Sequence, residues 1–411
     1  MSKPVIYCLC FCLIWSCAEE KNPLKKVIAG DSFLQTLAQN PDHEVQIIYT
    51  KIDRDENQKP HFTTYTFQYD SERYIYPAST VKLPVALLAL EEIENLRIKG
   101  LTANSFMVTD SASVNQTAVY TDATASNLKP SVAQYIKKIL LTSDNDAYNR
   151  LYEFLGQDTI NENLRRKGYD ETRIIHRLSL PLTPEENLLA NPITFFENDT
   201  AIYELPLRKS SGRYHTDKQV FKGKGYEKNG KTVMEPFDFT YKNFFPLHEQ
   251  HRMLMALFFP DQFPAHQFRL PGTSHDLIYR YMGMMPQESE ISSYQNREDY
   301  WPAYVKFLMY GSAPDTVPPA NIRIFNKIGQ AYGYLIDNAY IVDFDNNVEF
   351  ILSAVIHVNK NKIYNDGVYE YDSIGFPFMA EVGKAVYKME LERTKPVKPE
   401  LQRLEQLFEE Q

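Results

Sequence analysis

Cysteine is nearly absent from this 411-residue sequence, and its four copies all lie within the first 17 residues. The remaining residues therefore offer no disulfide framework, no cysteine ligands for a metal and no thiol nucleophile. An excess of basic residues is also lacking, because 44 Lys and Arg face 53 Asp and Glu for a formal net charge of −9. A general nucleic-acid-binding protein would need a basic surface, so we expect no nucleic-acid partner.

The first 17 residues form a distinct segment. Lys3 precedes an apolar run over residues 4–15, which is too short for a mature membrane-spanning helix and is typical of a secretory signal. The run ends in Leu-Ile-Trp-Ser-Cys at residues 13–17, which resembles a bacterial lipobox. The resemblance implies lipidation of Cys17. We therefore expect an exported lipoprotein on the periplasmic face or the surface of the outer membrane, attached through its lipid anchor only.

The rest of the chain divides by composition. We expect a tether over residues 18–43 that leads to a short helix over residues 32–38, and a catalytic domain over residues 44–392. A charged tail follows over residues 393–411, and its spaced leucines favour a short amphipathic helix. Residues 203–247 are rich in Lys and Arg and contain Asn229-Gly230, a strong hairpin signal. We interpret them as a basic, exposed insertion, either a solvated face or a partner-binding surface.

Strand and helix patterns indicate an α+β fold. Short runs of alternating or continuous apolar residues predict a hairpin early in the chain and an antiparallel meander late in it. Helical periodicity between them predicts an all-helical subdomain from about Ser79 to Tyr310, with helices over residues 131–139 and 300–310. The predicted strands cover residues 44–52, 61–69, 322–329, 334–342 and 348–358, and a closing helix covers residues 376–392.

Ser79-Thr80-Val81-Lys82 begins the helix around which the chain is organised. The residues from Val81 to Leu90 are apolar on nearly every face, as in a helix central to a core. Ser79 and Lys82 lie one turn apart on the same side, so a desolvated Lys82 amine could take the hydroxyl proton of Ser79. The pattern is weak alone, since Ser79 is also an ordinary helix cap and a second Ser-x-x-Lys occurs at residues 126–129.

Two further motifs follow in order. Ser143-Asp144-Asn145 lies on the turn between two predicted helices, where it is either a helix cap or a group of side chains facing a cleft. Lys327-Ile328-Gly329 lies on the first strand of the meander. In this order and these settings the three motifs resemble those of class A β-lactamases and penicillin-binding proteins.

The resemblance implies a role for each motif. Ser79 would attack an acyl carbonyl, Lys82 would accept its proton, and Ser143 would relay a proton to the leaving nitrogen with the help of the Lys327 charge. The remaining implied roles belong to Asn145, which would hold the substrate amide, Gly329, which would leave room for substrate, and Gln330, whose backbone N–H would complete an oxyanion hole with that of Ser79.

The sequence departs from the family pattern in three places. Ile328 stands where the family usually has a hydroxyl that binds the substrate carboxylate. Class A enzymes have a loop glutamate that is followed four residues later by an asparagine, and no glutamate of the corresponding loop here has that spacing. Glu186 is our candidate for the deacylating base. The interval between Ser143 and Lys327 is also long, which fits the insertion.

The favoured function is a serine acyl hydrolase acting on an amide or ester, first of all β-lactam hydrolysis. The alternatives are a peptidoglycan DD-peptidase or esterase, a sensor that stays acylated by penicillin, and a surface protein whose insertion docks a partner. We expect a small-molecule acyl substrate, a monomer, and no cofactor or metal. His248-Glu249-Gln250-His251 departs from the zincin spacing, so we interpret both histidines as helix-surface residues.

Overall fold

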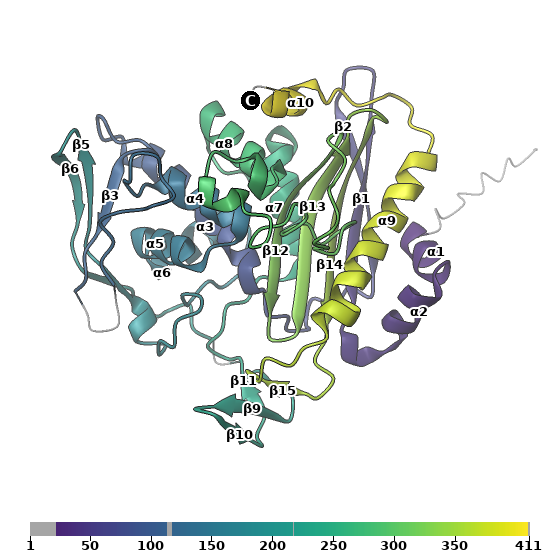
Figure 1. Ribbon diagram of the computed structural model, residues 1–411, viewed down its shortest axis with the longest axis horizontal. Helices are drawn as coiled ribbons and strands as arrows, with labels where there is room; N and C mark the ends of the chain where they lie inside the picture. Colours follow the sequence, from purple (N-terminus) through teal and green to yellow (C-terminus); the bar gives the residue numbers. More distant parts are fainter. Residues whose placement is uncertain (1–21, 113–116, 217, 410–411) are drawn as a thin grey trace, which may run out of the picture.

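The computed structural model describes residues 22–112, 117–216 and 218–409 (Figure 1). Cys17 and the predicted signal lie outside the described residues. A five-stranded antiparallel sheet in the order β12-β13-β14-β1-β2 forms the centre and confirms the α+β expectation. The predicted hairpin and meander are both confirmed, as β1 Gln46–Arg54, β2 Pro60–Phe67, β12 Ile322–Ala331, β13 Tyr334–Asp343 and β14 Val348–His357.

Three helices cover one face of the sheet (Figure 1). They are α1 Pro23–Ala29, α2 Ser32–Gln39 and the predicted closing helix α9 Phe376–Glu392. Strands β13 and β14 are buried along their whole length because helices cover both of their faces.

The tether expected over residues 18–43 is wrong for the part that the structure describes. Helices α1 and α2 bury Leu24, Ile28, Leu34 and Leu37 in the same cluster as strands of the sheet. Asp31 caps α2 by accepting a hydrogen bond from the amide of Leu34 at 2.9 Å. The short helix predicted over residues 32–38 is confirmed as α2, whereas α1 was not predicted.

The other face carries most of the remaining helices. Helix α7 Leu247–Phe258 lies on the sheet, and α3 Lys82–Leu96 runs through the centre of the helical layer with nearly every side chain of its first three turns buried. Around α3 pack α4 Val132–Thr142, α5 Asn145–Leu155, α6 Gln157–Arg166 and α8 Gly272–Gly283. The helices predicted around Ser79 and after Ser131 are therefore confirmed.

The expected all-helical subdomain contains strands as well. A three-stranded sheet in the order β3-β5-β6 lies at its far end (Figure 1). A further pair, β4 and β7, joins this region to the start of the insertion. The helix predicted over residues 300–310 is wrong, because these residues form successive turns. The strands are β3 Phe106–Thr109, β4 Leu189–Ala190, β5 Ile193–Glu197, β6 Thr200–Leu205 and β7 Arg208–Lys209.

The insertion is a hairpin, as predicted, with Asn229-Gly230 at the turn between β9 and β10. It is not merely solvated, however. The Lys222 amine lies 2.8 and 2.7 Å from the two carboxylate oxygens of Glu44, and this pair anchors the insertion to the domain. Its strands are β8 Phe221–Lys222, β9 Gly225–Lys228, β10 Lys231–Val233 and β11 Phe237–Asp238, and β15 Ile363–Tyr364 adds to β9 in parallel.

The tail ends in the predicted amphipathic helix, α10 Gln402–Glu409. Leu404, Leu407 and Phe408 pack against the helical layer, so this part of the tail belongs to the fold. Across residues 22–112, 117–216 and 218–409, every helix is too short or too polar to cross a membrane.

Because the apolar face of α2 is buried, shortening one of its side chains should lower the stability of the protein. Leu34 is fully buried, and we expect Leu34→Ala to lower the free energy of unfolding by about 2–4 kcal/mol, as for other large-to-small core changes. Phe33→Ala is the matched control, because the side chain of Phe33 is next to Leu34 in the sequence but 36% exposed. Urea unfolding of the three proteins measures the difference. Equal, small effects of both substitutions would indicate that α2 is a tether after all.

Candidate active site

Ser79 lies in a short 3-10 turn, Ala78–Val81, that runs directly into α3. Pro84 falls in the first turn of α3, where amide groups have no intrahelical partner, so it does not interrupt the helix. Ala78 has a positive φ of 49°, which is uncommon for a residue other than glycine. This strained residue sets the direction of the turn and thereby of the Ser79 hydroxyl.

Gly329 allows the turn to pack against β12. A Cβ atom at this position would lie 2.6 Å from the carbonyl oxygen of Pro77 and 3.0 Å from Cγ2 of Thr80. We expected Gly329 to leave room for substrate along the strand. The structure corrects this expectation, because the turn that carries Ser79 occupies the space beside Gly329.

The Lys82 amine is the centre of the site. It is fully buried and lies 2.8 Å from Ser79 Oγ. It also lies 3.1 Å from Ser143 Oγ and 2.7 Å from Asn145 Oδ1, and it donates to the carbonyl oxygen of Ser143. Burial, followed by the positive charge of Lys327, lowers the pKa of Lys82 well below its usual value. A neutral amine at this place can accept the proton of Ser79.

The Ser143-Asp144-Asn145 turn fulfils both interpretations of its sequence. Asp144 is the cap of α5, since its carboxylate accepts a hydrogen bond from the amide of Ala147 at 2.8 Å. Ser143 ends α4 in the left-handed conformation, with φ 58°. Because Asp144 performs the capping, the side chains of Ser143 and Asn145 both reach Lys82.

Lys327 approaches the same hydroxyl from β12. Its amine donates to Ser143 Oγ at 2.8 Å, so Ser143 bridges the two lysines. Burial lowers the pKa of Lys327 to about 7, and the neighbouring charge of Lys306 adds to this, whereas Asp337 opposes it. The amines of Lys82 and Lys327 both lie close to Ser143 Oγ, so a positive charge on one of them disfavours a positive charge on the other. This repulsion favours a neutral Lys82 beside a protonated Lys327.

Two hollows of the surface meet at Ser79. The smaller has a volume of about 380 Å³ and includes Asn145, Ser179 and Gln330 in its lining. The larger, of about 1300 Å³, has Gln330 and Ile328 in its lining together with aromatic side chains. Those aromatic residues are Trp301, Tyr304, Phe307, Tyr310, Phe376 and Tyr387. Ser79 can thus be reached by ligands from two sides.

Ile328 gives the larger hollow an apolar wall beside the site. Its side chain is only 6% exposed and belongs to the buried cluster that contains Val305 and Phe307. No hydroxyl is present at this position to bind a carboxylate, as the sequence indicated.

Glu186 is the one proposed catalytic residue that the structure does not bring to the cluster. It lies in the short helix Glu186–Leu188, and its carboxylate accepts a hydrogen bond from the amide of Thr183 at 2.7 Å. Neither hollow at Ser79 is lined by Glu186. The pairing of Thr183 with Glu186 is a local turn of the loop, which explains why an acid occurs there.

Sequence reasoning missed Ser179. Its hydroxyl accepts a hydrogen bond from the Asn145 amide at 2.9 Å, and Ser179 lines the smaller hollow. The loop around it is held to α5, because Asn149 exchanges hydrogen bonds with the backbone of Leu178 at 2.9 and 3.0 Å. No signal in the sequence distinguishes Ser179 from other loop serines, since only the fold brings it to Asn145.

Comparison with models of known protein families found one match. The model of the beta-lactamase enzyme family matches residues 31–204, which confirms the resemblance for this segment. The match includes Ser79, Lys82 and Ser143, whereas Lys327 lies outside it. A comparison with curated proteins found no match.

Several solved structures are similar over most of their length. PBP-A is 14% identical, with 89% of this chain and 96% of that chain covered and a TM-score of 0.49. A beta-lactamase from Burkholderia ambifaria is 13% identical, with 88% and 98% covered and a TM-score of 0.48. A beta-lactamase from Chitinophaga pinensis DSM 2588 is 11% identical, with 90% and 99% covered and a TM-score of 0.48.

The lowered pKa of Lys327 predicts a pH dependence of stability. Between about pH 7 and the ordinary lysine value of 10.5, the unfolded chain binds a proton at this residue that the folded chain does not. Stability therefore increases as pH rises through this window. We expect wild type to gain about 2 kcal/mol more than Lys327→Met between pH 7.5 and 9.5 in urea unfolding. Lys384→Met, at a half-exposed lysine, is the control. The same pH dependence in Lys327→Met as in wild type would contradict a lowered pKa for the buried amine of Lys327.

Proposed function

We propose that this chain is a serine acyl hydrolase that forms an acyl-enzyme on Ser79 with an amide or ester, because the model of the beta-lactamase enzyme family matches residues 31–204. One observation carries the proposal: the buried amine of Lys82 lies 2.8 Å from Ser79 Oγ. That distance is within the reach required of a general base, and the lowered pKa of Lys82 favours the neutral amine, which can accept a proton.

In the acylation step, Ser79 Oγ forms a bond with the acyl carbon and its proton passes to Lys82 Nζ. The developing oxyanion would be held by the backbone N–H groups of Ser79 and Gln330. The bond to the leaving nitrogen or oxygen then breaks as Ser143 gives that atom its proton. Ser143 is replenished by Lys82, 3.1 Å away, and a protonated Lys327 stabilises the charge on Ser143 during the transfer.

Lys82 is neutral again once the leaving group has departed. It can then take a proton from a water molecule that attacks the acyl-enzyme, and Ser79 recovers its proton when the acid is released. We assign deacylation to Lys82 rather than to Glu186, because the carboxylate of Glu186 is bonded to the loop backbone and lies outside both hollows.

β-Lactam hydrolysis is the first candidate activity. Asn145 supports it, because this side chain lines the smaller hollow next to Ser79 and is oriented by Lys82 and Ser179. An amide there can bond the acylamide side chain that penicillins and cephalosporins carry.

A second candidate is hydrolysis of an ester or peptide that lacks the lactam carboxylate. Ile328 favours it, since an apolar wall beside Ser79 gives a carboxylate no hydrogen-bond donor from that side chain. The aromatic lining of the larger hollow, including Trp301 and Tyr304, suits an uncharged apolar or aromatic group instead.

Intact-mass spectrometry tests the proposal and separates the candidates. The protein is mixed with a penicillin, with a cephalosporin and with a neutral phenyl ester, and Ser79→Ala is the control. We expect an acyl adduct with at least one reagent that is absent in the variant. A short-lived lactam adduct supports β-lactam hydrolysis, a lasting one supports a penicillin-acylated sensor, and an adduct with the ester alone supports the second candidate. Failure of all three reagents to acylate the folded protein would refute the serine hydrolase.

A further inference from the structure

Helix α7 carries a second group of chemically active side chains, away from Ser79. The sequence suggested that His248 and His251 both lie on the helix surface, and this is wrong for His251. Its ring is buried, and its nitrogens lie 2.7 Å from Thr50 Oγ1 and 2.9 Å from Ser353 Oγ. His251 is thus committed to the sheet, and His248 has different partners.

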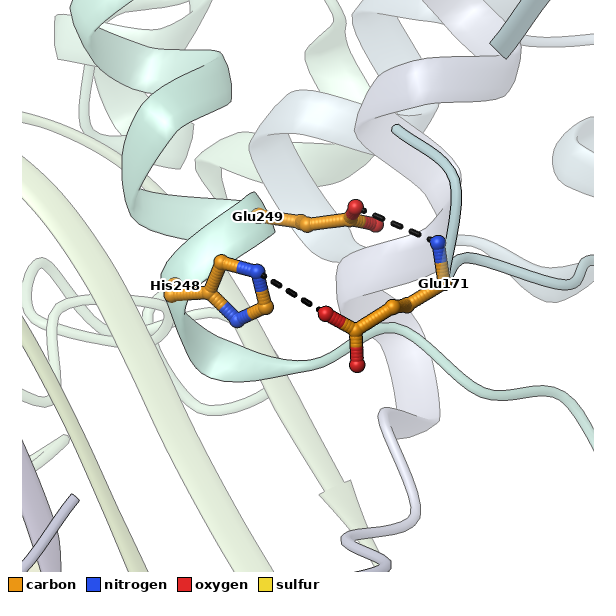
Figure 2. Close-up of side chains that lie close together, drawn as sticks. All are labelled: Glu171, His248 and Glu249. Carbon is orange, nitrogen blue, oxygen red and sulfur yellow. Dashed lines mark hydrogen bonds and ion pairs between the residues drawn. The ribbon is translucent and has the colours of Figure 1, made fainter. Parts of the chain in front are cut away.

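His248 and Glu249 meet Glu171 from a segment 77 residues earlier (Figure 2). One ligand atom from each of the three side chains lies within 4.8 Å of the others. His248 Nε2 lies 3.3 Å from a carboxylate oxygen of Glu171. Figure 2 shows the imidazole and both carboxylates converging between α7 and the loop that follows α6.

These separations suit a tetrahedral cation. Zinc binds imidazole nitrogen and carboxylate oxygen at about 2.0–2.2 Å, which places neighbouring ligand atoms about 3.3–3.5 Å apart. The His248–Glu171 separation already has this value, and the ligand atom of Glu249 lies within 4.8 Å of both. A mixed set of one nitrogen and two oxygens also fits Zn²⁺ better than Ca²⁺ or Mg²⁺, which favour oxygen ligands in larger number.

The imidazole is held in the form and direction that a metal ligand needs. His248 Nδ1 lies 2.6 Å from the hydroxyl of Tyr69, so Nδ1–H can donate to Tyr69 and leave the Nε2 lone pair facing Glu171. Neutral imidazole is the form that binds metals.

The charge of the group also favours a cation. Glu249 is buried, and its carboxylate accepts hydrogen bonds from the amides of Glu171 and Thr172 at 3.2 and 3.0 Å and from the Thr172 hydroxyl. The group thus brings two carboxylates together, whereas the guanidinium of Arg252 donates to the Gly168 carbonyl oxygen at 3.2 Å.

We propose that Glu171, His248 and Glu249 form a structural site for Zn²⁺, with a water molecule as the fourth ligand. The ion would join the start of α7 to the segment after α6. Six residues beyond Glu171 that segment reaches Arg177, whose guanidinium pairs with Glu153 at 3.0 Å, and then Leu178 and Ser179 in the wall of the smaller hollow. Zinc would thus stabilise the loop that lines the cleft without touching the reacting atoms, and the site does not depend on the function proposed for Ser79.

Isothermal titration of the untagged, chelator-treated protein with ZnCl₂ tests the proposal. Glu171→Gln and His248→Ala remove one ligand each, and Glu171 is exposed enough for its variant to fold. His61→Ala is the matched control, because His61 Nε2 lies 3.3 Å from Asp55, as His248 does from Glu171, but without a second carboxylate in the group.

We expect one Zn²⁺ per chain with a dissociation constant below about 10 µM, weakened at least tenfold in both ligand variants and unchanged in His61→Ala. CaCl₂ and MgCl₂ should give no comparable binding. Thermal unfolding should show a rise in Tm with zinc in wild type and in His61→Ala only. Absence of stoichiometric binding in wild type, or equal binding in Glu171→Gln and wild type, would overturn the proposal.

Discussion

The burial of a single amine constrains the whole active site. Lys82 is fully buried, so the protein itself must supply its hydrogen-bond partners, which are Ser79, Ser143 and Asn145. A buried lysine without such partners would be strongly unfavourable. The requirement therefore fixes the turn before α3 and the α4–α5 turn relative to each other.

Local backbone features make this convergence possible. Ala78 and Ser143 both adopt positive φ values, and Gly329 lets the turn of Ser79 approach β12 where a Cβ would collide with Pro77. Lys327 then reaches Ser143 from the sheet. Three segments far apart in sequence thus bring the hydroxyls of Ser79 and Ser143 together with two buried amines at the junction of two hollows.

Much of this arrangement was predictable because its signals are local. Strand alternation predicted β1, β2 and the meander, and helical spacing together with cap residues predicted α4 and α5 on either side of Ser143. The three motifs predicted which side chains meet, since each has a fixed place relative to its own element. The family match over residues 31–204 agrees with two of them.

The parts that failed depend on tertiary contacts. Residues 22–43 were assigned to a tether with one short helix, because the packing of α1 and α2 against the sheet is visible only in the fold. Glu186 was chosen as a glutamate of the loop, but its carboxylate accepts a hydrogen bond from the amide of Thr183 in the same loop. Likewise the approach of Glu171 to His248 leaves no trace in the sequence, since the fold alone brings together residues from different segments.

The protonation state of Lys82 is the most direct test of the account. NMR of protein labelled with ¹⁵N at the lysine side chains, with Lys82→Met to assign the signal, follows this amine as pH is varied. The account predicts a neutral amine at pH 7 that gains its proton only at lower pH. Titration of Lys82 near the ordinary lysine value of 10.5 would contradict the account, because a protonated amine cannot accept the proton of Ser79.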